Sequence, residues 1–273
     1  MKVTRRQFFQ RMGLAAASVV GLGGYSFAEA RQFEVNEHTL PVKGLQSAVR
    51  VAHLSDLHYS ALVSLTQIES WIKATMQRRP DLILITGDFI SNSEDYAGIH
   101  DLGRVLSQLR APLGVYGVWG NHDYYLPPER LIEFEQVLRQ AGIRLLNNAA
   151  VQLRPDLQLA GLDDLVEGLP SLEAALQNLK QDIGVLLMSH NPDVLPQVPE
   201  WVDLTLCGHT HGGQVRLPLV GAIHIPSRFG ERFAQGVVHA PARGFVSRGL
   251  GVTGVPFRFL CDAELVMLNL QPV

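Results

Sequence analysis

Hydrophobic positions follow two alternating periods along the first part of the chain. Residues 65–79 carry apolar side chains at helical spacing, and Pro80 ends this pattern. Residues 81–86 then form a continuous apolar run rich in β-branched side chains, which is typical of a parallel strand covered on both faces. Together with a first strand over residues 45–54, this region predicts a β-α-β unit.

The same alternation of helix and strand patterns continues to about residue 210. Further helices are predicted over residues 99–109, 128–141 and 171–180. Strands are predicted over residues 113–119, 144–146 and 184–188, from residue 203 onward, and as a hairpin of residues 151–153 and 157–162. Residues 212–273 show short strands with Gly and Pro turns and no helical period. We therefore predict an α/β protein in which two packed sheets are flanked by helices.

The first thirty residues have the composition of a targeting segment. Arg5 and Arg6 precede an apolar, glycine-rich run over residues 12–27, and residues 28–30 read Ala-Glu-Ala, a small-residue cleavage site. This segment resembles a twin-arginine signal peptide, which implies export to the periplasm or cell envelope by the twin-arginine (Tat) machinery. The run is shorter than the roughly 20 apolar residues of a membrane-spanning helix, so an uncleaved anchor is the less favoured alternative.

The chain as a whole has the composition of one large globular domain. Hydrophobic residues make up 47% of the 273 positions and charged residues 18%, which is enough for a full core. We expect a signal peptide over residues 1–30 and a single domain over residues 31–273, with its core at about 45–271. Cys207 and Cys261 could pair, but a buried Cys207 acting as a small hydrophobe is at least as plausible, so the sequence leaves the pairing open.

The charge balance limits the classes of partner. Without its first thirty residues the chain has 19 basic and 25 acidic residues, a balance of −6. Such a protein has no broad positive surface for a nucleic-acid backbone, so nucleic acid is not an expected partner. Any phosphate that it binds should be met locally, by a metal or by a few cations.

Side chains of the types that bind metals follow five of the predicted strands, here taken in chain order. In an α/β fold the carboxyl ends of the strands converge on one crevice, so groups that are distant in sequence can meet there. Each alone has an ordinary explanation as a turn former or a capped loop residue. Their joint placement instead predicts one site, and the successive strand ends carry Asp56 and His58, then Asp88, then Asn121 with His122, then His190, then His209 and His211.

The types of ligand narrow the choice of metal. A mixed set of imidazole, carboxylate and amide groups without thiolate argues against structural zinc, and calcium would take oxygen ligands alone. Manganese is favoured, with iron or catalytic zinc as alternatives. The candidates are too many for one ion, but they can fill two sites about 3.5 to 4 Å apart if one carboxylate bridges them.

The order of these motifs resembles the calcineurin-like metallophosphoesterases. The chain reads D-x-H, G-D, G-N-H-D, an isolated His and G-H-T-H between Asp56 and His211. The twin-arginine start, the Gly-Leu-Asp-Asp element at residues 161–164 and the segments 247–251 and 256–258 resemble the exported phosphodiesterase branch of that family. The resemblance implies a four-layer αββα sandwich of two mixed β-sheets flanked by helices.

The resemblance also implies an arrangement of ligands around two divalent metal ions. Asp88 would bridge the ions, and His122 would bind neither. One ion would be held by Asp56, His58, Asp88 and His211, and the other by Asp88, Asn121, His190 and His209.

Four further residues are predicted to act near the metals. His122 is placed to donate a proton to a phosphate oxygen or to the leaving alkoxide, and Asp123 could fix its tautomer. Asp164 and Arg248 could approach the substrate. For Asp164 a structural turn, and for Arg248 an ordinary surface position in a glycine loop, are comparable explanations.

These observations predict an exported, dinuclear-metal phosphodiesterase that hydrolyses phosphoester bonds by means of a metal-activated hydroxide. Its substrate would be a small or lipid-linked phosphate ester, and peripheral association with a membrane is left open. The enzymatic alternatives are a pyrophosphatase of the UDP-2,3-diacylglucosamine type and a phosphomonoesterase. A metal-binding envelope factor with a vestigial site is the non-enzymatic alternative, which the complete set of ligands disfavours.

Overall fold

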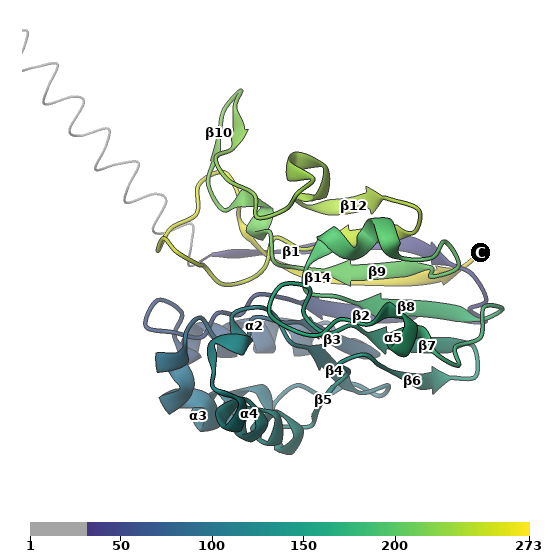
Figure 1. Ribbon diagram of the computed structural model, residues 1–273, viewed down its shortest axis with the longest axis horizontal. Coiled ribbons are helices and arrows are strands. Elements are labelled where there is room, and N and C mark those ends of the chain that lie inside the picture. The colour runs from purple at the N-terminus through teal and green to yellow at the C-terminus, as the bar shows by residue number, and fades with distance from the viewer. Residues whose placement is uncertain (1–31) are drawn as a thin grey trace, which may run out of the picture.

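Two six-stranded mixed sheets form the centre of the protein (Figure 1). The computed structural model describes residues 32–273, so the predicted signal peptide over residues 1–30 lies outside the described residues. The first sheet has the order β1(Phe33–Val42), β14(Ala263–Pro272), β2(Val49–Leu54), β3(Leu82–Thr86), β4(Val115–Val118) and β5(Ile143–Leu145). The second has the order β12(Gly236–His239), β13(Arg243–Val246), β9(Leu204–Cys207), β8(Gly184–Met188), β7(Leu157–Gly161) and β6(Ala149–Arg154).

The strands that precede the candidate ligands are parallel within each sheet. β2, β3, β4 and β5 pair in parallel, and so do β7, β8 and β9. A separate short hairpin of β10(Arg216–Leu217) and β11(Gly221–Ala222) projects from one end of the molecule (Figure 1). The carboxyl ends of the parallel strands therefore meet at one end of the sandwich.

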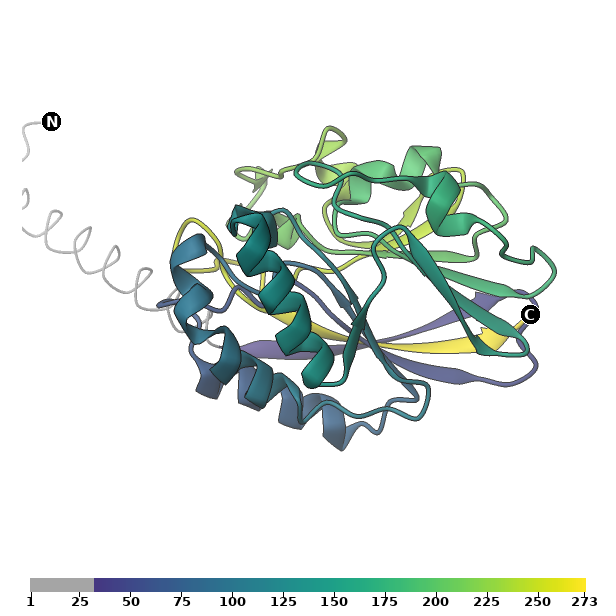
Figure 2. The same ribbon diagram turned by 60° about the horizontal axis from the view of Figure 1, so that its bottom comes forward.

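Helices cover the outer face of each sheet, which confirms the predicted four-layer αββα sandwich. On the first sheet lie α2(Leu65–Gln77), α3(Ile99–Leu106) and α4(Pro128–Gln140) (Figure 2). The second sheet is covered more thinly, by α5(Leu172–Leu176) and a 3₁₀ turn at Pro192–Gln197. α5 starts after its predicted N-cap, Ser171, whose hydroxyl accepts from the Ala174 amide at 3.2 Å, but it ends well before the predicted residue 180. In residues 32–273 every helix is too short or too polar to cross a bilayer.

The main core lies between the two sheets. Val49 and Val51 of β2 point into it, whereas Ala52 and Leu54 of the same strand face the helices. From the second sheet, Leu206 and its neighbours on β8 complete the contact. β3 and β8 are buried on both faces, so their sequences are almost continuously apolar, and these apolar runs located them.

The first strand, β1, was not among the predicted elements. It pairs in parallel with β14 along its whole length, from Phe33 opposite Ala263 to Val42 opposite Pro272. It contains four consecutive polar residues, 36–39, and several of its side chains are exposed because it lies at the edge of the sheet. The structured core thus begins at residue 33 and not near residue 45, and β14 occupies an interior position between β1 and β2.

Candidate metal centre

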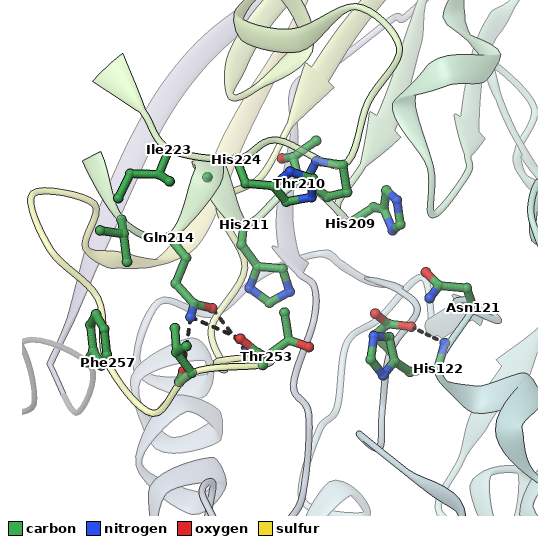
Figure 3. A pocket seen from close by; sticks show the side chains of 16 residues that line it. Asn121, His122, His209, Thr210, His211, Gln214, Ile223, His224, Thr253 and Phe257 are labelled. Atoms are coloured by element: carbon green, nitrogen blue, oxygen red, sulfur yellow. Dashed lines mark hydrogen bonds between the residues drawn. The ribbon is translucent and has the colours of Figure 1, made fainter. Parts of the chain in front are cut away.

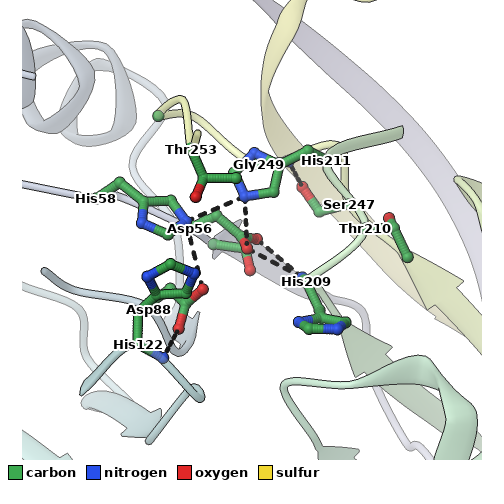
Figure 4. Close-up of polar contacts among 12 residues, drawn as sticks. Asp56, His58, Asp88, His122, His209, Thr210, His211, Ser247, Gly249 and Thr253 are labelled. Atoms are coloured by element: carbon green, nitrogen blue, oxygen red, sulfur yellow. Dashed lines mark hydrogen bonds and ion pairs between the residues drawn. The ribbon is translucent and has the colours of Figure 1, made fainter. Parts of the chain in front are cut away.

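All seven predicted ligands lie at the end of the sandwich where the parallel strands finish. Asp56 and His58 follow β2, Asp88 follows β3 and Asn121 follows β4 of the first sheet. His190 follows β8, and His209 and His211 follow β9 of the second sheet. The packing of one sheet on the other therefore brings together residues that are separated by up to 155 positions, as Figure 4 shows for most of them.

One group of ligand atoms comes from Asp56, His58 and His211. Nε2 of His211 lies 3.0 Å from Nε2 of His58 and 3.3 Å from Oδ1 of Asp56 (Figure 4). All three side chains are buried, and their ligand atoms lie within 4.8 Å of one another. Two ring nitrogens and a carboxylate oxygen that face one small volume are a donor set that a divalent cation would satisfy.

Asp88 joins this group to a second one. Its Oδ2 lies 3.3 Å from Nε2 of His58 and 3.3 Å from Nε2 of His190. His190 in turn is 3.2 Å, ring nitrogen to ring nitrogen, from Nδ1 of His209. Burial alone would raise the pKa of Asp88, but the imidazoles of His190 and His58 outweigh it and hold the pKa well below its usual range. Asp88 is therefore an ionised carboxylate in contact with both groups of histidines.

Two further observations fit a cation at the second group. Within residues 32–273, Oδ1 of Asn121 is buried and has no hydrogen-bond partner, which is costly unless a ligand occupies that position. Burial, and then the neighbouring His190, lower the pKa of His209 to about 4, so its imidazole is in the neutral form that binds metals. The residues present therefore fit a divalent metal in each group.

The backbone at these ligands is strained. Five of the seven have left-handed backbone, with φ between 49° and 70° at Asp56, His58, Asp88, His209 and His211. Each such residue costs on the order of 1 kcal/mol or more, and the conformation persists only where the surroundings impose it. Here the amides of Asp56 and His58 donate to the carbonyls of Gly87 and Asp88 at 3.1 and 2.9 Å. Such strain concentrates at functional sites.

Two glycines leave room for the carboxylates. A Cβ atom on Gly208 would lie 1.8 Å from Oγ of Ser55 and 2.3 Å from Oδ2 of Asp56. A Cβ atom on Gly120 would lie 2.2 Å from Oδ1 of Asp88. Any larger residue at either position would displace a ligand carboxylate.

Asp123 does not act on His122 as predicted. Its buried carboxylate accepts from the amides of Asp88 and Gly120 at 2.9 Å each, and from Phe89 and Ile90 at 2.9 and 3.2 Å. The predicted contact between Asp123 and His122 does not form because the two residues enter a 3₁₀ turn and their side chains diverge. Asp123 instead holds the loop that presents Asp88.

The tautomer of His122 is set by a backbone carbonyl. Nδ1 of His122 donates to the carbonyl oxygen of Ser91 at 2.7 Å, which leaves Nε2 for a ligand. The backbone amide of His122 donates to Oδ1 of Asp88 at 2.9 Å, so this histidine stands directly beside the central carboxylate. It also comes close enough to His58 and Asp88 to form a third group of potential ligands.

The two predicted substrate contacts, Asp164 and Arg248, have structural partners. Oδ1 of Asp164 accepts from the amides of Val166 and Glu167 at 2.9 and 2.8 Å, which closes a turn. The guanidinium of Arg248 pairs with Glu34 and Glu264 at 3.3 and 3.2 Å. These contacts favour the structural explanation for both residues.

A different arginine, Arg258, was missed by the sequence reasoning as a site residue. Its side chain is fully buried and donates to the carbonyls of Gly251 at 2.7 Å and Arg248 at 2.8 Å. It also reaches Nδ1 and the carbonyl oxygen of His211, each at 3.4 Å. Arg258 thereby ties the C-terminal loop to a candidate metal ligand. The available signal in the sequence was the segment 256–258, which resembles the exported phosphodiesterase branch.

A cavity of about 540 Å³ opens from this centre. Asn121 and His122 lie at one end of it, and Ile223 and Phe257 at the other (Figure 3). His209 and His224 also line a second groove of about 590 Å³, with Asn191, Asp193 and Arg228. The centre is thus open to solvent and to a ligand on two sides.

Comparison with known proteins agrees with this geometry. The family model described as Calcineurin-like phosphoesterase matches residues 49–213, more than half of the chain. The chain is 31% identical over 284 residues to the uncharacterized metallophosphoesterase YkuE of Bacillus subtilis, with 99% of this chain and 98% of that protein covered. It is 34% identical over 282 residues to phosphodiesterase YaeI of Escherichia coli, with 98% and 99% covered. The chain therefore belongs to the calcineurin-like phosphoesterase family.

Proposed function

We propose that this hydrolase of phosphoester bonds is a phosphodiesterase that works with two divalent cations. The observation that carries the proposal is the position of Asp88, whose Oδ2 lies 3.3 Å from both His58 and His190. A carboxylate shared in this way is the arrangement expected of a bridge between two cations. The similarity to a relative named as a phosphodiesterase supports the choice of diester over monoester.

The residues that would hold each cation follow from the two groups. His58, His211 and Asp56 would hold one, with Asp88. Asn121, His190 and His209 would hold the other, also with Asp88. Bound there, two divalent cations, with manganese favoured over iron or zinc, would offset the charge of a phosphate ester and lower the pKa of a water molecule.

The protein's own groups would supply the remaining chemistry. His122 lines the cavity beside Asp88, with its ring fixed through Nδ1 by the Ser91 carbonyl. When protonated, its Nε2 would donate to a phosphate oxygen or to the departing alkoxide, which lowers the barrier to loss of the leaving group. The two open sides of the centre would leave space for both ester arms of a diester.

Hydrolysis of two model esters tests this function. With Mn²⁺ the purified protein should hydrolyse bis(p-nitrophenyl) phosphate, lose this activity after treatment with EDTA and regain it when Mn²⁺ is added back. Release of p-nitrophenol from p-nitrophenyl phosphate should be slower. Equal or faster cleavage of the monoester would indicate a phosphomonoesterase, and cleavage restricted to a pyrophosphate bond would indicate the UDP-2,3-diacylglucosamine type of enzyme. No turnover on any phosphoester with both metals bound would indicate a metal-binding factor.

The proposal includes export by the twin-arginine route to the periplasm or cell envelope. Its support is the pair Arg5 and Arg6, the glycine-rich apolar run and the Ala-Glu-Ala site. Replacing both arginines by lysine should leave most of the protein in the cytoplasmic fraction with its signal intact, as seen by cell fractionation and mass of the product. Unchanged distribution of this variant would contradict the route.

A further inference from the structure

The cavity at the metal centre has two ends of opposite chemistry. One end consists of the ligands and His122. The other end is lined mainly by apolar side chains, and we call it the apolar limb; it consists of Val215, Ile223, Val255 and Phe257, together with Gln214 and Thr253. Figure 3 shows Ile223 and Phe257 at this end of the cavity. On the adjoining strand β10, the guanidinium of Arg216 pairs with the carboxylate of Glu231 at 2.9 Å. The limb therefore offers a ligand apolar contact with no charged partner.

The apolar limb is held open by hydrogen bonds. The side chain of Gln214 donates to the carbonyls of Thr253 and Val255 and accepts from the Thr253 amide, all at 3.0 Å. The Ile223 amide donates to the Val215 carbonyl at 3.1 Å on the facing wall. Both walls are thus fixed to the turn that carries His211, so the limb is a preformed site and not a gap between mobile loops.

The apolar surface continues outward from the limb. On the projecting β10–β11 hairpin, Leu217, Leu219 and Val220 are exposed. In the limb itself, Ile223 and Phe257 keep 64% and 36% of their surface exposed. A continuous apolar surface of this kind marks a binding site, because leaving it in water costs free energy in proportion to its area.

The other side of the centre is more polar. The second groove, beyond His209, has apolar residues in its lining as well, but unlike the limb it also carries charged and amide side chains. It is lined by Asn191, Asp193, Ser227 and Arg228 together with Leu165, Val166, Ile225 and Pro226. An ester whose phosphorus lies at the metal centre would thus meet hydrocarbon along one arm and polar groups along the other. A substrate with two polar arms would leave the apolar limb unfilled.

We infer that the physiological substrate is a phosphodiester with one hydrocarbon arm, an alkyl or acyl chain that binds in the apolar limb. This inference rests on the proposed phosphodiesterase function and names its class of substrate. The other arm is polar. The chain could belong to a dissolved amphiphile or to a lipid held in a membrane, since both present the same hydrocarbon.

A series of p-nitrophenyl alkyl phosphates tests the inference. Each methylene that the limb buries should raise kcat/KM by up to about fourfold, because burial of one CH₂ is favourable by about 0.8 kcal/mol. From the methyl to the octyl diester we expect kcat/KM to rise by at least about tenfold. The double variant Ile223→Ser/Phe257→Ser should lose this rise, so that its kcat/KM for the octyl ester divided by that for the methyl ester falls to near one. Both side chains are partly exposed, so the variant is expected to fold.

The matched control is Ile132→Ser/Leu169→Ser, which removes two exposed apolar side chains away from the cavity, 59% and 85% exposed. It should keep the full rise. No dependence on chain length in the wild type, with the methyl ester hydrolysed, would overturn the inference and leave the proposed function standing. Failure to hydrolyse even the methyl ester would overturn both. A rise that survives the double variant would refute the assigned location.

The two possible sources of the hydrocarbon chain are distinguished by supplying it either as a dissolved ester or as a lipid in a vesicle. Turnover of the octyl ester below its critical micelle concentration would assign a dissolved amphiphile. Faster turnover of phosphatidyl-p-nitrophenol in phosphatidylcholine vesicles, lost when Leu219 on the hairpin tip is replaced by serine, would assign a membrane lipid.

Discussion

Asp88→Asn is expected to reduce phosphodiester hydrolysis by at least about 10³-fold and to weaken binding at both metal positions. The carboxylate contacts His58 of one group and His190 of the other, so its charge serves both cations. Asparagine has the same shape and tolerates the left-handed backbone that this position requires, φ 54°. The backbone amides that donate to Asp123 remain in place, and the variant should therefore fold.

Metal content by inductively coupled plasma mass spectrometry and titration calorimetry with Mn²⁺ measure this effect. His209→Asn is the matched comparison. Asparagine is too short to replace the imidazole, and the hydrogen bond from the backbone amide of residue 209 to Asp56 is retained. That variant should lose affinity mainly at one position. Retention of two tightly bound ions in Asp88→Asn, or equal loss at both positions in His209→Asn, would contradict the bridged arrangement.

His122→Ala is expected to keep both metals and to lose turnover by about 10² to 10⁴-fold, the usual contribution of a positioned acid. The loss should be larger for a dialkyl phosphate than for a p-nitrophenyl diester, because an alkoxide needs a proton more than p-nitrophenolate does. The backbone amide of His122, which donates to Asp88, is unaffected by the substitution. Single-turnover rates with both leaving groups, at saturating Mn²⁺, measure the difference.

His100→Ala serves as its control, since His100 is an exposed histidine of α3 that pairs with Glu133 and does not line the cavity. It should be close to the wild type in both metal content and rate. His122 lies near His58 and Asp88, so binding to a metal is a real alternative for it. Loss of one metal equivalent in His122→Ala would establish that alternative and remove the role of proton donor.

The sequence was most informative where burial imposes a pattern on it. β3 and β8 are buried along their whole length, so their apolar runs and the Asp or His that follows them were recognisable. β1 escaped recognition because an edge strand need not be apolar on both faces. The left-handed backbone at the ligands leaves no trace in composition, since asparagine, aspartate and histidine are common in turns of every kind.

At the site, the sequence does not show in which direction each side chain points. Asp123 is adjacent to His122 in the chain, yet it faces the opposite way and holds four amides of neighbouring loops. Arg248 and Arg258 stand ten residues apart in similar glycine-containing segments. The fold alone decides that Arg248 pairs with Glu34 and Glu264 and that Arg258 is buried behind His211.

The interior position of β14 has a consequence for the kinetics of folding. β14, which lies between β1 and β2, is synthesised after the other strands of its sheet, and Ala263 at its start pairs with Phe33 of β1. Until it arrives, β1 has no partner and β2 presents an open edge, which is a template for aggregation. Such non-local pairing slows folding, so the sheet closes late and after translation. A nascent chain of this protein therefore depends on protection of that edge until its C-terminal strand has left the ribosome.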